Sequence, residues 1–192
     1  MKEINTSSRI FNGTLSPLPG VYTLDPVHTF AEFTTQHLVV GRVRGRFDEL
    51  TGTCTIAEDP TQSSLEVSIK TTSISTHNTK RDEDLRSPRF FHVDEFPTLT
   101  YRGAKIVAEL DGHWTVEGNL TIRNVTLPTP LSVRITGIVD DPFGNIRVGI
   151  QALAQVSRRD FGLLADLERE NGGVLLGKDV VITVEAEGLL EK

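Results

Sequence analysis

The chain has 192 residues, of which 38% are hydrophobic and 24% are charged, and its formal net charge is −6. This length and composition suit one globular domain with a substantial core. The negative charge argues against non-specific binding to nucleic acid or to an anionic membrane, and the single cysteine, Cys54, excludes an intrachain disulfide.

The segment from Met1 to Pro19 is rich in Ser, Thr, Asn and Pro and lacks the continuous apolar run of a signal peptide. No later run approaches the length of a membrane span. We therefore expect an N-terminal tail over residues 1–19, followed by one folded domain over residues 20–192. We also expect a cytoplasmic location rather than a periplasmic or secreted one. The apolar residues of the tail are predicted docking points, and they are Ile10, Phe11, Leu15 and Leu18.

Residues 28–37 predict a long strand with two different faces, because successive strand side chains point to opposite sides. One face carries Thr29, Ala31, Phe33, Thr35 and His37, and the other carries His28, Phe30, Glu32, Thr34 and Gln36. The side chains of the first face are mostly small, and polar and apolar ones are mixed around the single phenyl ring of Phe33. A fully packed core requires more bulk, so this face is the first indication of a hollow interior.

Short alternating segments separated by turn signals continue to the C-terminus. The segments predicted as strands are 42–47, 51–56, 64–71, 98–102, 105–110, 114–122, 131–137, 147–156 and 180–186. Asp111–Gly112 and the loop 140–145 are hairpin signals. Many short strands at regular spacing predict a β-sandwich or a β-barrel.

Two segments interrupt this pattern. In the first, 76–96, Thr79 is a candidate N-cap of a short helix, with Asp82 in the first turn and Pro88 soon after the end. The second, 161–173, is a long connection with partial helical character. Long ordered connections in a compact domain often form lids or entrances.

Arg81 and Asp82 on the predicted helix allow three interpretations. They form solvated local ion pairs, or a partly buried pair that pins the helix over a barrel end, or an acid and a base. The third interpretation lacks an activated nucleophile and an oxyanion site. We therefore predict no catalytic residues and do not expect an enzyme.

The histidines do not show the spacing of a metal site. His28 and His37 are an odd number of residues apart and point to opposite strand faces, whereas strand ligands converge on one face. We predict no metal site. His37 faces the interior, where it either hydrogen-bonds a polar ligand head or supports a neighbouring strand.

The presumed inward faces combine small side chains with large apolar ones. The small ones are Ala31, Thr35, Gly45, Gly52, Gly118, Ala152 and Ala154, and the large ones include Phe33, Phe47, Ile69, Tyr101 and Ile150. An eight-stranded barrel has room for one small ligand. The alternative is that the three glycines only relieve strand bending. Similarly, Phe90, Phe91, Phe96 and Phe161 form either a plug at a barrel end or an apolar entrance.

The sequence resembles the YceI-like family of polyisoprenoid-binding proteins. The motifs that carry the resemblance are Asp25-Pro26-Val27-His28 with Phe33 and His37, Gly45-Arg46-Phe47, Ser73-Ile74-Ser75-Thr76-His77-Asn78 with Arg81-Asp82, Leu85, Phe90-Phe91 and Phe96-Pro97, Gly118-Asn119-Leu120-Thr121-Ile122, and Arg158-x-Asp160-Phe161-Gly162. Thr29, Asn124 and Ser157 depart from the usual serine, glycine and asparagine of the family. The resemblance covers the chain from about Gly20 to its end.

The resemblance implies an extended lipocalin-like barrel of eight antiparallel strands with a short helical insertion. It also implies a tunnel for a long-chain isoprenoid lipid, such as a polyprenyl quinone or polyprenyl phosphate, no other cofactor, and often a homodimer. We predict that the protein binds, transports or stores such a lipid. The predicted ligand-binding residues are Phe33, Thr35, His37, Phe47, Ile69, Asn78, Arg81, Asp82, Phe90, Phe91, Tyr101, Ile150, Ala152, Arg158, Asp160 and Phe161. The polar members of this set either hydrogen-bond the head group or support the loops at the barrel mouth, and they are His37, Asn78, Arg81, Asp82, Arg158 and Asp160.

Two other functions remain open from the sequence. One is an enzyme that acts on a lipid or small apolar substrate within the barrel, with His37 or Asp82 as its base. The other is an interaction module with a filled barrel that binds a protein partner through outward residues such as Phe30.

Overall fold

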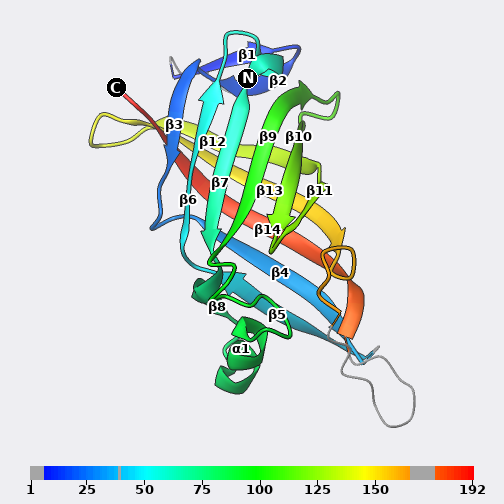
Figure 1. Cartoon of the computed structure of the whole chain (residues 1–192). Helices are drawn as coiled ribbons and strands as arrows, with labels where there is room; N and C mark the ends of the chain where they lie inside the picture. Colours follow the sequence, from blue (N-terminus) through cyan, green and yellow to red (C-terminus); the bar gives the residue numbers. More distant parts are fainter. Residues whose placement is uncertain (1–6, 39, 165–175) are drawn as a thin grey trace.

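The structure, a computed structural model, describes residues 7–38, 40–164 and 176–192. Eight antiparallel strands pair in a closed ring (Figure 1), in the order β13, β12, β10, β9, β7, β6, β3, β14 and back to β13. The ring consists of β3 (Gly20–Leu24), β6 (Leu50–Ile56), β7 (Ser64–Lys70), β9 (Thr98–Ala108), β10 (Trp114–Ile122), β12 (Leu131–Asp140), β13 (Ile146–Ser157) and β14 (Leu176–Leu190). The predicted eight-stranded antiparallel barrel is thereby confirmed.

The long strand β14 extends the barrel at one end. Its last residues, from Gly188 to Leu190, pair with β3. The part of β14 before them pairs with β4 (Phe30–His37), where Val184 lies opposite Ala31. β4 then pairs with β5 (Gly41–Phe47), and β5 pairs with the short β8 (Ile74–Ser75). Figure 1 shows the helix α1 (Thr79–Arg86) beside these added strands, so this end of the molecule is the α1 end.

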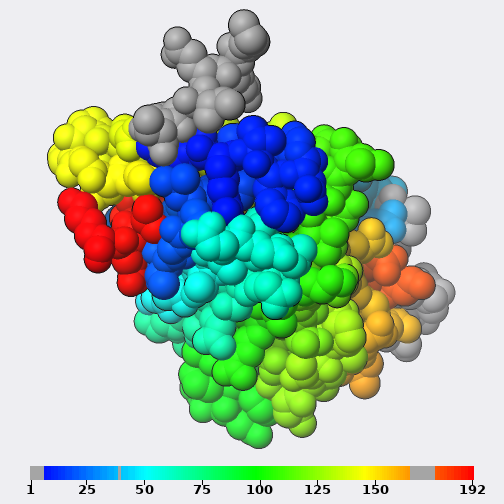
Figure 2. Space-filling view, turned by 90° about the horizontal axis from the view of Figure 1, so that it is seen from above, coloured from blue at the N-terminus to red at the C-terminus, as the bar shows by residue number. Residues whose placement is uncertain are grey.

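A hairpin lies at the opposite end of the barrel (Figure 1). It consists of β1 (Ser8–Phe11) and β2 (Thr14–Pro17), within the segment that the sequence predicted as a tail. Figure 2 looks onto this end and shows the hairpin, in dark blue, lying across it. The remaining elements are the 3₁₀ turns η1 (Pro60–Gln62) and η2 (Thr71–Ser73) and the strand β11 (Val125–Pro128). Among the described residues, no helix is long and apolar enough to cross a membrane.

The structure corrects one prediction of the strands. The segments 98–102 and 105–110 belong to a single strand, β9, whose register against β10 shifts beside Glu117 and Gly118. Before the shift, the odd-numbered residues Tyr101 and Gly103 point inward. After it, the even-numbered Ile106 points inward, and all three residues are buried. Because the bulge changes the phase of the alternation, one strand gives the sequence pattern of two.

The predicted short helix is confirmed as α1, but its predicted N-cap is wrong. Asn78, not Thr79, precedes the first helical turn, and its side-chain oxygen accepts a hydrogen bond from the Arg81 backbone N–H at 3.0 Å. His77, one residue earlier, has a positive φ of 57°. The turn at His77 directs the chain from β8 into the helix. The residue that follows this turn, Asn78, therefore takes the capping position, one residue earlier than predicted.

Candidate functional site

A cavity of about 650 Å³ occupies the interior of the barrel. This volume is within the usual range of small-molecule sites. The wall consists mainly of inward aliphatic side chains, which include Val67, Ile69, Leu99, Leu120, Ile122, Val133, Ile150, Ile182 and Val184. Ala31, Thr35, Ala152 and Ala154 also line the cavity, and their small side chains leave the space that larger ones would fill. The interior is therefore hollow, which contradicts the alternative of a filled barrel.

The three inward glycines do not provide this space. Gly45, Gly52 and Gly118 are absent from the cavity wall, and each lies under a neighbouring group. A Cβ atom at Gly118 would lie 2.6 Å from the Arg102 carbonyl oxygen and would also overlap the Tyr101 hydroxyl. The prediction that these glycines make room for a ligand was wrong, because they make room for adjacent side chains and backbone instead.

Aromatic rings form one section of the wall. Phe33 and Phe47 have ring centroids 5.9 Å apart, and Phe47 meets Phe91 edge-on at 5.6 Å. Phe90 also lines the cavity. Phe90 and Phe91 follow α1 in the chain, so the aromatic residues after the helix line the interior together with those of β4 and β5.

Tyr101 contributes its ring to the cavity but directs its hydroxyl elsewhere. The hydroxyl donates to the backbone oxygens of Val116, at 3.1 Å, and Thr129, at 3.0 Å. Burial raises the pKa of Tyr101 to about 12. The phenol is therefore neutral at physiological pH, and its polar group is satisfied by backbone rather than offered to a ligand.

Polar groups line the cavity at the α1 end. They include His37, Asn78, Lys80, Arg81, Asp84 and Arg89. The Arg81 guanidinium donates to the Thr76 hydroxyl at 2.7 Å and to the Thr76 carbonyl at 2.9 Å. Arg89 forms an ion pair with Asp84 at 3.2 Å. The cavity thus joins an apolar interior to a polar rim.

Arg158 also lines the cavity, although its guanidinium is almost completely buried. It donates to the backbone oxygens of Leu163 at 2.6 Å, Gly177 at 2.9 Å and Leu176 at 3.3 Å. These bonds hold the turn after β13 against the start of β14. Arg158 therefore has a clear role in supporting the wall.

The structure brings most predicted site residues to one cavity. Those that line it are Phe33, Thr35, His37, Phe47, Ile69, Asn78, Arg81, Phe90, Phe91, Tyr101, Ile150, Ala152 and Arg158. Other wall residues were absent from the predicted set, and they include Leu85, Leu131, Leu163, Leu176, Ile182 and Val184. The strict alternation of β14 was a usable signal for Ile182 and Val184. No regular spacing of apolar residues in the sequence indicated that Leu163 or Leu176 would line the cavity.

Three predicted site residues lie outside the cavity wall. The Asp82 carboxylate accepts hydrogen bonds from the Thr76 backbone N–H at 2.8 Å and hydroxyl at 2.5 Å. Arg81 and Asp82 therefore hold α1 through their shared partner Thr76 rather than as a direct pair. Asp160 is exposed and accepts from the Ser157 hydroxyl at 3.0 Å. Phe161 is only 2% exposed and packs in the hydrophobic core.

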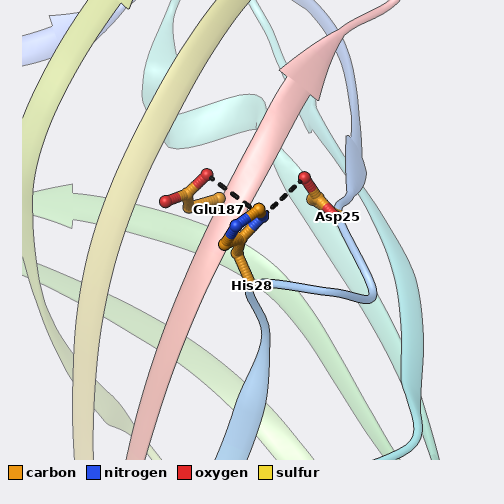
Figure 3. Close-up of side chains that lie close together, drawn as sticks. All are labelled: Asp25, His28 and Glu187. Carbon is orange, nitrogen blue, oxygen red and sulfur yellow. Dashed lines mark hydrogen bonds and ion pairs between the residues drawn. The ribbon is translucent and has the colours of Figure 1, made fainter.

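Asp25, His28 and Glu187 form a second polar cluster (Figure 3), and none of the three is among the residues that line the cavity. The His28 Nδ1 atom is 3.0 Å from an Asp25 oxygen and 3.9 Å from a Glu187 oxygen. The Arg147 guanidinium also pairs with Asp25, at 2.6 Å, and with Glu187, at 2.5 Å. It holds the pKa of Asp25 well below its usual range. Arg147 thus supplies positive charge to both carboxylates, and the cluster is an ion-pair network that ties β13 and β14 to the β3–β4 connection.

Residues 22–188 match the model of the YceI-like domain family. Protein YceI from Salmonella newport is 32% identical over 166 residues, which cover 86% of this chain and 83% of that protein. A UPF0312 protein from Yersinia enterocolitica is 36% identical over 141 residues, which cover 73% of each chain.

Solved structures share the fold at lower sequence identity. BcnA from Burkholderia cenocepacia superposes with a TM-score of 0.72 at 14% identity, over 85% of this chain and 98% of that one. A polyisoprenoid binding domain from Saccharophagus degradans, implicated in plant cell wall breakdown, gives a TM-score of 0.64 at 17% identity. That match covers 88% of this chain and 98% of that domain.

Proposed function

Because this chain belongs to the YceI-like domain family, we propose that it binds a long-chain isoprenoid lipid and carries or stores it without chemical change. The lipid is of the polyprenyl quinone or polyprenyl phosphate type. Its prenyl chain lies in the barrel cavity, and its head group lies among the polar residues at the α1 end. The polyisoprenoid binding domain of similar fold supports the choice of an isoprenoid chain.

The observation that carries this proposal is the composition of the cavity. Its interior is lined by aliphatic and aromatic side chains, whereas the polar groups gather at the α1 end. Transfer of each buried methylene group from water contributes roughly 0.8 kcal/mol. The ordering of a flexible chain and the loss of its translational freedom offset a large part of that gain. A long apolar chain with one polar end fits this distribution, and the chain supplies most of the affinity.

Mass spectrometry of organic extracts from the purified protein tests the proposal. The expected result is a long-chain isoprenoid lipid that copurifies and that is displaced by an added polyprenyl quinone. Repeatedly clean extracts, together with no binding of added polyprenyl quinone or polyprenyl phosphate, contradict the proposal. An extract that holds only straight-chain fatty acids contradicts the isoprenoid part of it.

The enzyme alternative retains one supporting observation, which is that His37 lines the cavity. Its other predicted base, Asp82, is bound to Thr76 instead. Incubation of the protein with the extracted lipid separates the two functions. A carrier returns the lipid unchanged, whereas a conversion that His37→Ala abolishes would favour the enzyme.

A further inference from the structure

A second, smaller cavity of about 110 Å³ lies between the main cavity and the β1–β2 hairpin. Leu24, Leu65, Val133 and Ile150 line both cavities. The two spaces therefore meet at this set of side chains, one toward α1 and the other toward the hairpin. With its head group at the α1 end, as proposed above, a bound apolar chain would direct its free end toward the smaller cavity.

The wall of the second cavity is apolar because its polar atoms are bonded elsewhere. The Tyr22 hydroxyl donates to the Leu18 carbonyl at 3.0 Å, and the Ser16 hydroxyl donates to the Pro17 carbonyl at 3.2 Å. Burial raises the pKa of Cys54, which also lines this cavity, to about 12. An apolar cavity of about 150 Å³ stays dry and accepts benzene. The space here is on the scale of one branched isoprene unit.

The hairpin forms the end wall of this cavity through Ser16 and Pro17. The Trp114 indole N–H donates to the Leu15 carbonyl at 3.0 Å, and its ring packs on Phe11 with centroids 6.4 Å apart. At the other side of the hairpin, the Arg9 guanidinium donates to the Ala57 carbonyl at 2.7 Å. The hairpin is therefore fixed to the barrel on two sides.

We propose that the smaller cavity receives the free end of the bound prenyl chain, and that the β1–β2 hairpin is the end stop that limits the length of the chain. The inference rests on the proposed function and adds a length limit to it. The hairpin, residues 8–17, precedes the part of the chain that matches the family model, residues 22–188. The proposed end stop thus lies in a segment outside the part of the chain that matches the family model.

The test measures the affinity of a series of ubiquinones whose side chains grow by one isoprene unit at a time. In the wild-type protein, affinity rises with chain length to an optimum and then stops rising. Cys54→Phe fills the smaller cavity, so we expect an optimum at a shorter chain and a loss of about tenfold or more for the wild-type optimum. Thr55→Phe is the matched control, because Thr55 is the exposed neighbour on the same strand, and it leaves the profile unchanged.

Gly188→Leu fills the same cavity from β14 if Cys54→Phe does not fold. A Cβ atom at Gly188 meets the Tyr22 Cβ atom at an ordinary distance of 3.5 Å, so the backbone accepts a side chain there. Wild-type length profiles in both folded variants would overturn the end-stop inference and leave the proposed function intact. Failure of the wild-type protein to bind any member of the series would overturn both.

A measurement without cavity variants provides an independent check. Trp114 is the single tryptophan and lines the smaller cavity. A prenyl alcohol of optimal length with bromine on its terminal unit should quench most of the Trp114 fluorescence, because heavy-atom quenching requires contact. The same alcohol with bromine beside the hydroxyl should quench little. Strong quenching by the second probe, with little by the first, would place the head group at the hairpin and overturn the inference.

Discussion

The ring of Phe33 lies directly over Gly45, which is its pairing partner on the adjacent strand β5. A Cβ atom at Gly45 would overlap the Phe33 Cζ atom and lie 2.7 Å from the Thr76 Cγ2 atom. The absence of a side chain at Gly45 therefore determines where the Phe33 ring rests. Phe33 lines the main cavity, so a displaced Phe33 ring would reduce the open space there.

Gly45→Ala should displace the Phe33 ring into the cavity. We expect a loss of stability of about 1–3 kcal/mol, typical of overpacking, and weaker binding of a polyprenyl quinone. Urea unfolding and a binding titration measure the two effects. Gly41→Ala on the same strand is the control, because a Cβ atom there meets only the His37 carbonyl oxygen, at 3.9 Å. Equal behaviour of the two variants would show that Phe33 adapts without cost.

Ala152→Trp should obstruct the main cavity while the barrel stays folded. Ala152 is 2% exposed, lines the cavity and pairs with Val133 and Val184, which line it too. An indole at this position occupies the path of the prenyl chain, so we expect at least a tenfold loss of quinone affinity. Leu153→Trp is the control, because Leu153 is 45% exposed on the outer face. Unchanged binding by Ala152→Trp would show that the ligand lies elsewhere.

Side-chain alternation predicted the barrel wall because a strand has only two faces. In β7, Leu65, Val67 and Ile69 alternate with polar residues, and all three line the cavity. The same reasoning failed where a bulge changed the phase within β9.

The residues outside regular strands were harder to place from sequence. Asp82, Asp160 and Phe161 were among the predicted ligand-binding residues, with a supporting role left open for the two carboxylates. In the structure, hydrogen bonds hold Asp82 and Asp160, and Phe161 packs in the core. These contacts depend on the tertiary position of Thr76, of Ser157 and of the core around Phe161. No local period in the sequence encodes such positions.

Asn78→Ala should destabilise the α1 end of the barrel. The Asn78 side chain accepts the Arg81 backbone N–H at 3.0 Å, and loss of such a cap costs about 1 kcal/mol. Thr79→Ala should cost much less, because Thr79 is an exposed first-turn residue and not the cap. Hydrogen exchange of the α1 amides measures the local effect, and urea unfolding measures the global one. A larger effect of Thr79→Ala than of Asn78→Ala would show that Thr79 caps the helix, as predicted from the sequence.

Because of the Arg147 ion-pair network, the free energy of unfolding should depend on pH in the acidic range. Arg147 and then His28 hold the pKa of Asp25 below its usual value of about 3.9. A carboxylate whose pKa is lowered by folding stabilises the fold above its unfolded pKa, and this stabilisation is lost as pH falls toward the folded pKa. The contribution of the network is therefore complete at neutral pH and declines below about pH 4.

Arg147→Met tests this dependence, because it keeps much of the aliphatic side chain and removes the charge. It leaves Asp25 and Glu187 without their shared cation, and Asp141, 3.6 Å from Arg147, also loses a partner. Since these groups are partly exposed, we expect a loss of about 1–2 kcal/mol at neutral pH. The difference from wild type should shrink in urea unfolding near about pH 3, where carboxylates of ordinary pKa are protonated. Arg134→Met, at an exposed position of β12, is the control and should change little at either pH. A loss for Arg147→Met that is equal at both pH values would mean that Arg147 stabilises the barrel by packing rather than by charge.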